Sequence, residues 1–453
     1  MLSLCLWGLG CIEPSPHPRL TEPPPIVIVG ARIVDGTGSA PRIGHSLLIR
    51  NGRIAAIGPN LRIPKDATRV DGAGMTLIPG LFDTHGHCFT ADGKSQFDSF
   101  PPLFLANGVT TTFSPGEADP AAAYAARDRL ASGEQIGARL LTAGPYFEKG
   151  QGEIAWLVGY SDRTEALEWL ATHGSRMDGL KLQMQITEDE AVAVLARAHE
   201  LGLKVTGHLG SLTARRGIEL GIDRLEHGLF AMSEFAPARI AGIDEWCAKF
   251  RMIGALDLSS DDVQDLVDQI VARRVVLSPT TVAFAAWTPD WKPVTSDWDE
   301  YLAPEIRRLE RGRALRIASL PAEQGAAFTA GVKKQLEFLA LVHARGGIIV
   351  TGTDTGDRRL IPGFALHREL AYLVQAGLTP LAALRAATGH AAWALGVDRD
   401  LGTIEAGKIA DLVLVRGDPT MDITAVADVV TVWKEGRAHD PAELLARAKG
   451  GIR

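Results

Sequence analysis

Two histidines stand two positions apart where an apolar run of the chain ends. The segment GLFDTHGHCFT, residues 80–90, carries His85 and His87 with Gly86 between them. Side chains of a strand alternate between its faces, so residues i and i+2 point the same way. The preceding run suits a buried strand, which would present both imidazoles together as ligands for a divalent metal. Taken alone, the two histidines would fit a polar surface loop equally well.

Further side chains of ligand type follow in or at the ends of other strand-like segments. They are Lys181 in DGLKLQ, His208 in VTGHLG, His227 in RLEHG and Asp354 in TGTDTG. A single buried histidine is more often a hydrogen-bonded structural residue than a ligand. Four imidazoles, a carboxylate and a lysine at the ends of separate strands instead indicate one shared site. For Lys181 the alternative is a side chain that points outward among the helices or extends its amine to water.

The middle of the chain alternates strand-like segments with alanine- and leucine-rich amphipathic runs. In the run 187–202, Thr187 and Glu190 predict a capping box. Eight β/α units predict an α/β fold, a (β/α)8 TIM-type barrel whose sites gather at the C-terminal ends of its strands. The candidate strands are residues 80–87, 108–115, 138–145, 179–184, 204–209, 223–228, 275–281 and 347–354.

Two longer segments, residues 229–274 and 282–346, are expected to be insertions over the mouth of the barrel. They contain four tryptophans that would either form a lid or substrate wall or, as is commoner, pack the insertions. These are Trp246, Trp287, Trp291 and Trp298.

Both ends of the chain consist of short β-branched runs separated by turn residues. In residues 26–58 the dipeptide Asn51–Gly52 lies between two such runs, which is a strong hairpin signal. Residues 401–437 have the same character. We therefore expect residues 26–79 and 397–440 to form one small β-sandwich domain, and residues 80–396 to form the barrel.

Residues 1–25 are expected to be a signal-like or disordered tail outside the fold. An apolar stretch that ends in Gly10–Cys11 and precedes a proline-rich segment resembles a bacterial lipoprotein signal, with Cys11 as the acylated residue. That stretch is short for a signal peptide and has no Lys or Arg before it, and the alternatives are a disordered tail or a misplaced upstream start. We expect the cell envelope in preference to the cytoplasm.

The composition excludes several classes of function. The chain has 453 residues, of which 46% are hydrophobic and 22% charged, as in globular proteins. A net charge of −7 argues against a nucleic-acid partner. No apolar run is long enough for a transmembrane span, and four cysteines are too few for a disulfide scaffold. A small-molecule substrate and a homo-oligomeric state are expected.

With these motifs in view, the sequence resembles the amidohydrolase superfamily, in its imidazolonepropionase-like and prolidase-like branch. The resemblance rests on the HxH of DTHGH, the histidines of TGHLG and EHG, the aspartate of GTDTG, and the run LTPLAALRAAT…LGTIEAGKIADLVLV. It covers roughly residues 26 to 440. It implies a (β/α)8 barrel with a small β-sandwich built from both chain ends.

The resemblance also implies a binuclear metal centre. In it His85, His87 and Asp354 hold one ion, His208 and His227 hold the other, and Lys181, carboxylated on its amine, bridges both. Zinc is the expected metal, although manganese, cobalt and iron suit these ligands as well. Apart from the family, a lysine between two leucines inside a barrel is costly to bury as an ammonium, and its neutral amine can add carbon dioxide. Imidazolonepropionases use one metal and lack this lysine, which favours the two-metal, peptidase-like members.

The expected activity is hydrolysis of an amide bond in a dipeptide, an N-acyl amino acid or a xenobiotic amide. A metal lowers the pKa of bound water from about 15.7 to about 7, and Asp354 would pass a proton to the leaving amine. The alternatives are a hydrolase of a cyclic amide, lactone or phosphoester, and a non-catalytic binding or assembly protein.

Two further residues are candidates for contacts with the substrate. Tyr146 in GPYFEKG would hydrogen-bond the substrate carbonyl, unless it merely packs. His367 in IPGFALHREL, with Arg368, would lie near a substrate carboxylate, unless both lie on a surface helix.

Overall fold

The computed structural model describes residues 24–90, 93–149, 158–236 and 243–453. The expected acylation site at Cys11 and nearly all of the expected tail lie outside these residues. Within them, no helix combines the length and the apolar character that crossing a membrane requires.

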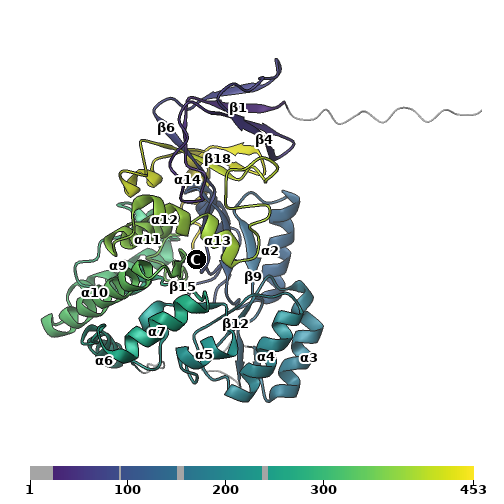
Figure 1. Cartoon of the computed structure of the whole chain (residues 1–453). Helices are drawn as coiled ribbons and strands as arrows, with labels where there is room; N and C mark the ends of the chain where they lie inside the picture. The colour runs from purple at the N-terminus through teal and green to yellow at the C-terminus, as the bar shows by residue number, and fades with distance from the viewer. Residues whose placement is uncertain (1–23, 91–92, 150–157, 237–242) are drawn as a thin grey trace, which may run out of the picture.

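Strands from both ends of the chain build two small sheets at one end of the molecule (Figure 1). The first has the order β4-β3-β1-β5, with β1 (Ile26–Val29), β3 (Ser46–Arg50), β4 (Arg53–Gly58) and β5 (Thr68–Asp71). The second has the order β19-β18-β17-β6-β2, with β2 (Arg32–Ile33), β6 (Met75–Pro79), β17 (Leu412–Arg416), β18 (Val429–Lys434) and β19 (Arg437–His439).

The pairing of β6 with β17 ties the two chain ends together. The two strands are antiparallel, and Leu77 lies opposite Leu414. Leu77 and Leu414 are buried in one apolar cluster with Ile28 and Trp433. The expected hairpin at Asn51–Gly52 is confirmed, since both residues have positive φ, 50° and 77°, between β3 and β4. The division of the chain after residue 79 and before residue 397 stays a prediction.

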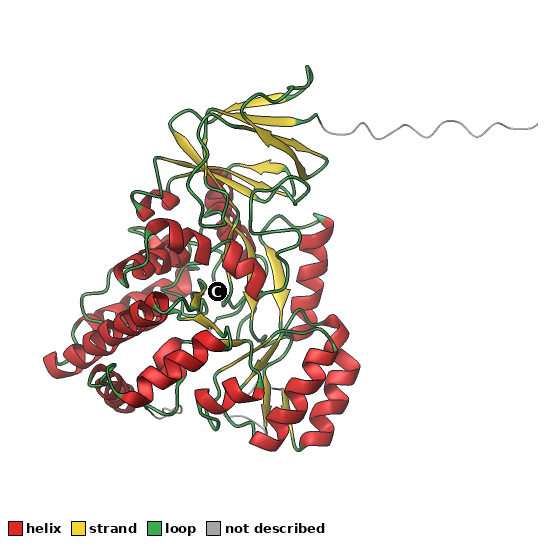
Figure 2. Ribbon diagram, viewed as in Figure 1, coloured by secondary structure: helices red, strands yellow, loops and turns green. Residues whose placement is uncertain are grey.

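The middle of the chain forms two parallel sheets flanked by helices (Figure 2). The three-stranded sheet contains β7 (Leu81–Asp83), β8 (Val109–Ser114) and β9 (Arg139–Thr142). The seven-stranded sheet has the order β11-β10-β12-β13-β14-β15-β16, with β10 (Phe147–Lys149), β11 (Val158–Tyr160), β12 (Leu180–Leu182), β13 (Val205–Gly207), β14 (Arg224–Glu226), β15 (Val276–Ser278) and β16 (Ile348–Ile349). All eight predicted strands are present, whereas β10 and β11 were not predicted.

Backbone hydrogen bonds connect the edges of the two parallel sheets. The amide of Thr84 donates to Thr351 O at 2.9 Å, and the amide of Asp354 donates to His85 O at 2.7 Å. β9, the other edge of the three-stranded sheet, is joined to the segment just before β12, since Asp178 N donates to Thr142 O at 2.9 Å. The strands nevertheless form two parallel sheets and not one closed sheet. The predicted parallel β/α architecture is therefore present, whereas a closed barrel is not observed among the described residues.

Helices cover the outer faces of the parallel sheets. Those that follow individual strands are α1 (Phe100–Ala106), α2 (Pro120–Ser132), α3 (Arg163–His173), α4 (Glu188–Glu200), α5 (Ala214–Leu220), α7 (Asp261–Ala272), α10 (Ala322–Ala344) and α11 (Phe364–Gln375). The remaining α-helices are α6 (Ile243–Gly254), α8 (Thr281–Ala285), α9 (Pro304–Ala318), α12 (Pro380–Ala386), α13 (Gly389–Ala394) and α14 (Pro441–Ala448). The predicted capping box of Thr187 and Glu190 is confirmed at the start of α4.

The tryptophans of the two longer segments pack against other aromatic rings or are buried. Trp246 of α6 stacks on Trp287, with ring centroids 6.0 Å apart, and Trp298 is 7% exposed. Trp287 also stacks on Phe328 of α10 at 6.1 Å. The contacts of Trp246, Trp287 and Trp298 therefore favour the packing interpretation over a substrate wall.

Candidate metal centre

The residues of ligand type converge because parallel strands end on the same side of their sheets. His85 and His87 follow β7, His208 follows β13, and His227 follows β14. The ring centroids of His85 lie 5.1 Å from His87 and 4.7 Å from His227, and those of His208 and His227 are 4.3 Å apart. Four imidazoles from three separate strands thus form one continuous group.

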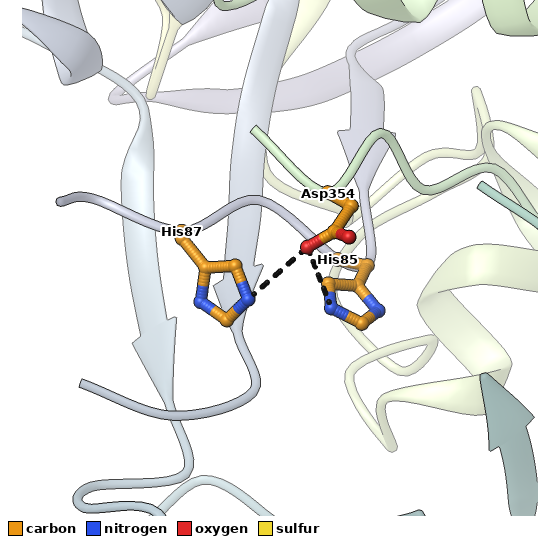
Figure 3. A group of neighbouring side chains, drawn as sticks. All are labelled: His85, His87 and Asp354. Carbon is orange, nitrogen blue, oxygen red and sulfur yellow. Dashed lines mark ion pairs between the residues drawn. The ribbon is translucent and has the colours of Figure 1, made fainter. Parts of the chain in front are cut away.

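Asp354, which follows β16, brings a carboxylate to the same group (Figure 3). Its Oδ1 lies 3.4 Å from His85 Nε2 and 3.3 Å from His87 Nε2. One ligand atom from each of the three residues lies within 4.8 Å of the others, which is a spacing that can hold a metal ion. The Asp354 side chain remains 33% exposed, so this group is accessible to solvent.

Hydrogen bonds determine which ring nitrogen of His85 and of His87 could coordinate a metal ion. His85 Nδ1 donates to Glu226 Oε2 at 2.6 Å, and His87 Nδ1 donates to Gly116 O at 3.1 Å. A carboxylate and a carbonyl only accept hydrogen bonds, so each Nδ1 carries the proton. Each Nε2 faces Asp354 and is the ring nitrogen that can coordinate a metal ion.

The surroundings of the other two histidines, His208 and His227, favour the neutral imidazole over the protonated form. Burial lowers the pKa of both His208 and His227 well below the usual value. His208 Nε2 is buried and has no hydrogen-bond partner among the described residues. His227 Nδ1 lies 2.7 Å from Thr280 Oγ1, which fixes the orientation of its ring. A buried imidazole nitrogen without a partner fits a metal ligand.

Lys181 lies in the middle of β12 and is 1% exposed. Burial lowers the pKa of its amine to about 8. Its Nζ lies 5.6 Å from the centroid of the Tyr146 ring, and it forms no ion pair within the described part of the chain. A buried amine with a lowered pKa and no paired carboxylate can react in its neutral form.

The loops that carry these side chains have an uncommon backbone conformation. Positive φ angles occur at four residues that are not glycine. One of them lies shortly after each of the strands β13, β14, β15 and β16. They are Leu209 (49°), His227 (59°), Thr280 (46°) and Asp354 (55°). Such conformations cost about 1–3 kcal/mol each and persist where the surroundings enforce them.

Two buried side chains enforce this loop geometry. Gln335 of α10 donates to His227 O and to Pro279 O, both at 3.2 Å, and accepts from Leu229 N at 2.9 Å. Asp83 accepts from Thr353 Oγ1 at 2.5 Å. The long insertion helix and the first strand therefore both restrain the ends of neighbouring strands.

Tyr146 lies beside the histidine group, as expected from its position after the third strand. Its hydroxyl is 3.2 Å from His87 Nε2, and its ring is buried. Gly116 makes this approach possible, because a Cβ there would lie 2.9 Å from the Tyr146 ring. Tyr146 thus contacts a residue of the candidate site through its polar end.

His367 has a different environment from the one expected for a substrate contact. It lies on α11, and its half-buried ring donates through Nε2 to Asn107 O at 2.8 Å. Asn107 is the C-terminal capping residue of α1. Arg368 likewise donates to a backbone carbonyl, that of Pro293. These contacts are with backbone carbonyls of other segments, and the role of His367 as a substrate contact stays a prediction.

Sequence reasoning missed two buried glutamates near the site. Glu226 is fully buried and accepts hydrogen bonds from His85, from Arg224 Nε at 2.8 Å and from Thr206 Oγ1. Its signal in the sequence was weak, since it consisted only of the charged pair Arg224 and Glu226 at positions i and i+2 of a short strand.

Glu117, which follows β8, is also fully buried, and burial raises the pKa of its carboxyl group to about 8. The segment PGEAD around it carried no signal of burial.

Comparisons with known proteins agree with the fold. The model of the amidohydrolase family matches residues 76–439. The chain is 26% identical to the imidazolonepropionase of Deinococcus radiodurans over 414 residues, which cover 85% of this chain and 90% of that protein. It is 23% identical to adenine deaminase 1 of Jannaschia sp. over 92% of its own length, and that match spans 61% of the deaminase.

A solved structure shares the fold over nearly the whole chain. It is the crystal structure of a putative prolidase from Bifidobacterium longum, with a TM-score of 0.70 and 24% sequence identity. The match covers 94% of this chain and 99% of the prolidase chain. At this identity the likeness establishes the architecture, which is that of a TIM-like barrel with an additional domain.

Replacing Gly86 with alanine should weaken metal binding. A Cβ at this position would lie 2.6 Å from Thr112 Oγ1 and 3.0 Å from Phe104 Cζ, so the backbone between His85 and His87 would have to shift. We expect a loss of metal affinity of about tenfold or more, measured by competition with a chelator. Gly312→Ala on α9, where no atom lies within 4 Å of an added Cβ, is the control. Equal affinities in all three proteins would contradict this prediction.

Replacing Glu117 with glutamine should stabilise the protein increasingly as the pH rises. Because the pKa of Glu117 is raised from 4.5 to about 8, the folded state keeps a proton that the unfolded chain releases. The wild type therefore loses stability between these pH values, and the always-neutral glutamine does not. Thermal unfolding at pH 5, 7 and 9 should show a Tm difference that grows with pH. The exposed Glu305→Gln should show no such trend, and a constant difference for Glu117→Gln would refute the assignment.

Proposed function

This chain belongs to the amidohydrolase family, an enzyme family acting on carbon–nitrogen bonds, and from that premise we propose that it hydrolyses an amide bond in a small substrate through a binuclear metal centre. The observation that carries the proposal is the pair of Nε2 atoms of His85 and His87 facing the same carboxylate oxygen of Asp354. Each Nδ1 is already hydrogen-bonded to an acceptor, so Nε2 is the nitrogen that would coordinate a cation.

The donor set fits two divalent cations, most simply zinc. His85, His87 and Asp354 would hold one ion, His208 and His227 the other, and a carbamate on Lys181 would bridge them. The buried, unpartnered Nε2 of His208 supports the second site. When bound, the ions would supply Lewis acidity and lower the pKa of a water molecule towards neutrality.

The side chains of the chain itself would position the substrate and move protons. Burial raises the pKa of Asp354, but its contacts with His85 and His87 outweigh this and hold the pKa well below the usual value, so it is a carboxylate at neutral pH. Its partial exposure lets it accept a proton from the nucleophilic water and transfer it to the leaving amine. The Tyr146 hydroxyl, beside His87, would donate a hydrogen bond to the substrate carbonyl oxygen.

We further propose that the two parallel sheets close into a (β/α)8 barrel. The hydrogen bonds from Thr84 to Thr351 and from Asp178 to Thr142 support closure at both edges. We also propose that residues 26–79 and 397–440 form the small domain and residues 80–396 the barrel. The mouth of this barrel would be the side where His85, His208, His227 and Asp354 follow their strands.

The substrate we propose is a dipeptide, an N-acyl amino acid or a related small amide. Lys181 supports this class over a single-metal hydrolase of cyclic amides, since a buried lysine beside four imidazoles suits a bridging carbamate. The test is a screen of dipeptides and N-acyl amino acids against zinc-loaded protein, with cyclic amides, lactones and phosphoesters as parallel arms. Turnover of only cyclic amides, only lactones or only phosphoesters would refute the proposed substrate class.

The variant Asp354→Asn should fold and bind metal but lose nearly all turnover. The amide keeps the shape of the carboxylate and leaves both HxH histidines in place, but it cannot accept the proton from water. We expect kcat to fall by about 10²–10⁴-fold, measured on the best substrate of the screen. Asp398→Asn at an exposed position is the control. A variant that keeps most of the wild-type rate would remove Asp354 from the proton-transfer role.

Metal-loaded protein prepared in ¹³C-bicarbonate should show a carbamate carbon signal that depends on Lys181. The Lys181→Met variant should lack the signal. Lys249→Met should keep it, because Lys249 is also buried, with a pKa lowered to about 8, but lies on α6 away from the histidines. Since the neutral fraction of the Lys181 amine rises as the pH passes about 8, the carbamate should form faster at pH 9 than at pH 6 when the concentration of dissolved carbon dioxide is kept equal. A signal that persists in Lys181→Met would contradict the assignment.

A further inference from the structure

Glu226 connects the candidate metal centre to the interior of the parallel sheet. It is the last residue of β14, and its side chain has no exposed surface. One carboxylate oxygen, Oε2, accepts the hydrogen bond from His85 Nδ1 at 2.6 Å. The other, Oε1, accepts from Arg224 Nε at 2.8 Å and from Thr206 Oγ1. Each oxygen therefore has its own partner, and only one of them faces the histidine group.

The partners on the far side of Glu226 hold its carboxylate in a fixed orientation. Arg224 is 4% exposed, and its guanidinium lies over the ring of Phe113, 5.0 Å from the centroid. Arg224 Nε also donates to Thr206 Oγ1 at 3.3 Å. Because Arg224, Thr206 and Phe113 are all buried, Glu226 cannot rotate away from His85 without breaking an ion pair in the interior.

We propose that Glu226 is a positioning residue of the metal centre, which fixes the ring of His85 with Nε2 towards Asp354 and increases the affinity of the centre for divalent cations. The proposal rests on the metal-dependent function proposed above. A carboxylate that accepts from Nδ1 holds the proton on that nitrogen and makes Nε2 a stronger donor to a cation. It also adds a negative charge close to the cations, in an interior where charges are weakly screened.

A purely structural role would give a different result. In that case Glu226 would only neutralise Arg224, and its loss would destabilise the fold without a specific effect on metal affinity. Asp411 offers a matched control for this role. It is 6% exposed and accepts from Arg139 Nη1 at 2.7 Å, and its carboxylate contacts none of the four histidines among the described residues.

The experiment compares metal binding in the wild type, Glu226→Gln and Asp411→Asn, all in the full chain. Each protein is freed of metal, and its affinity for Zn²⁺ is measured by competition with a chromophoric chelator, together with thermal unfolding of the metal-free form. We expect Glu226→Gln to bind zinc about 10–100-fold more weakly than the wild type. Asp411→Asn should bind zinc with the wild-type affinity even where its Tm is lower.

The outcomes separate this inference from the proposed function. A wild type that binds no divalent ion tightly overturns both the metal-dependent function and the role of Glu226. A wild type that binds zinc tightly, with equal affinity in Glu226→Gln, overturns the role of Glu226 alone. If Glu226→Gln does not fold, Glu226→Asp replaces it, because aspartate keeps the charge but withdraws the carboxylate from His85. Unchanged zinc affinity in Glu226→Asp would likewise overturn the proposal.

Discussion

Charged and titratable side chains are concentrated in the interior of the parallel sheets, where water cannot stabilise them. Lys181, Arg224 and Glu226 are each nearly or fully buried, and His85 has no exposed surface. Burying such groups costs free energy unless each has a partner or changes its protonation state. The pairing of Arg224 with Glu226, and of Glu226 with His85, satisfies three of them. Lys181 has no ion pair among the described residues, and burial lowers the pKa of its amine to about 8 although the charges of Glu226 and Asp354 oppose this shift.

The rest of the molecule can be understood as support for this group. The ends of β13 to β16 carry residues in left-handed conformations, which Gln335 of α10 and Asp83 of β7 hold in place. The paired strands β6 and β17 join the two chain ends, and β6 leads directly into β7 and the HxH motif. Mutations in the small domain should therefore reach the site through the position of β7.

Periodicity and spacing were sufficient to predict the eight strands and the residues of ligand type at their ends. The alternation of strand and helix patterns repeats along the chain, and a parallel sheet brings the C-terminal ends of its strands to the same side. The strands β10 and β11 and the buried state of Glu117 could not be predicted in this way. Each depends on contacts between distant segments, such as the parallel pairing of β10 with β12, which leave no local pattern. Glu226 was adjacent to a recognised histidine, but its role required the position of His85.

The charge balance of the interior links the state of Lys181 to the number of cations that the site can hold. With Lys181 as an ammonium, the two carboxylates Asp354 and Glu226 are balanced by Lys181 and Arg224, and two divalent ions would leave a large positive excess in a poorly solvated space. Conversion of the ammonium to a carbamate replaces a positive charge by a negative one and removes half of that excess. In the centre that we propose, a second ion would therefore be favoured once the lysine is carboxylated, and cations would in turn stabilise the carbamate. On this argument the two proposed events would be coupled, and the buried amine would set the occupancy of the centre.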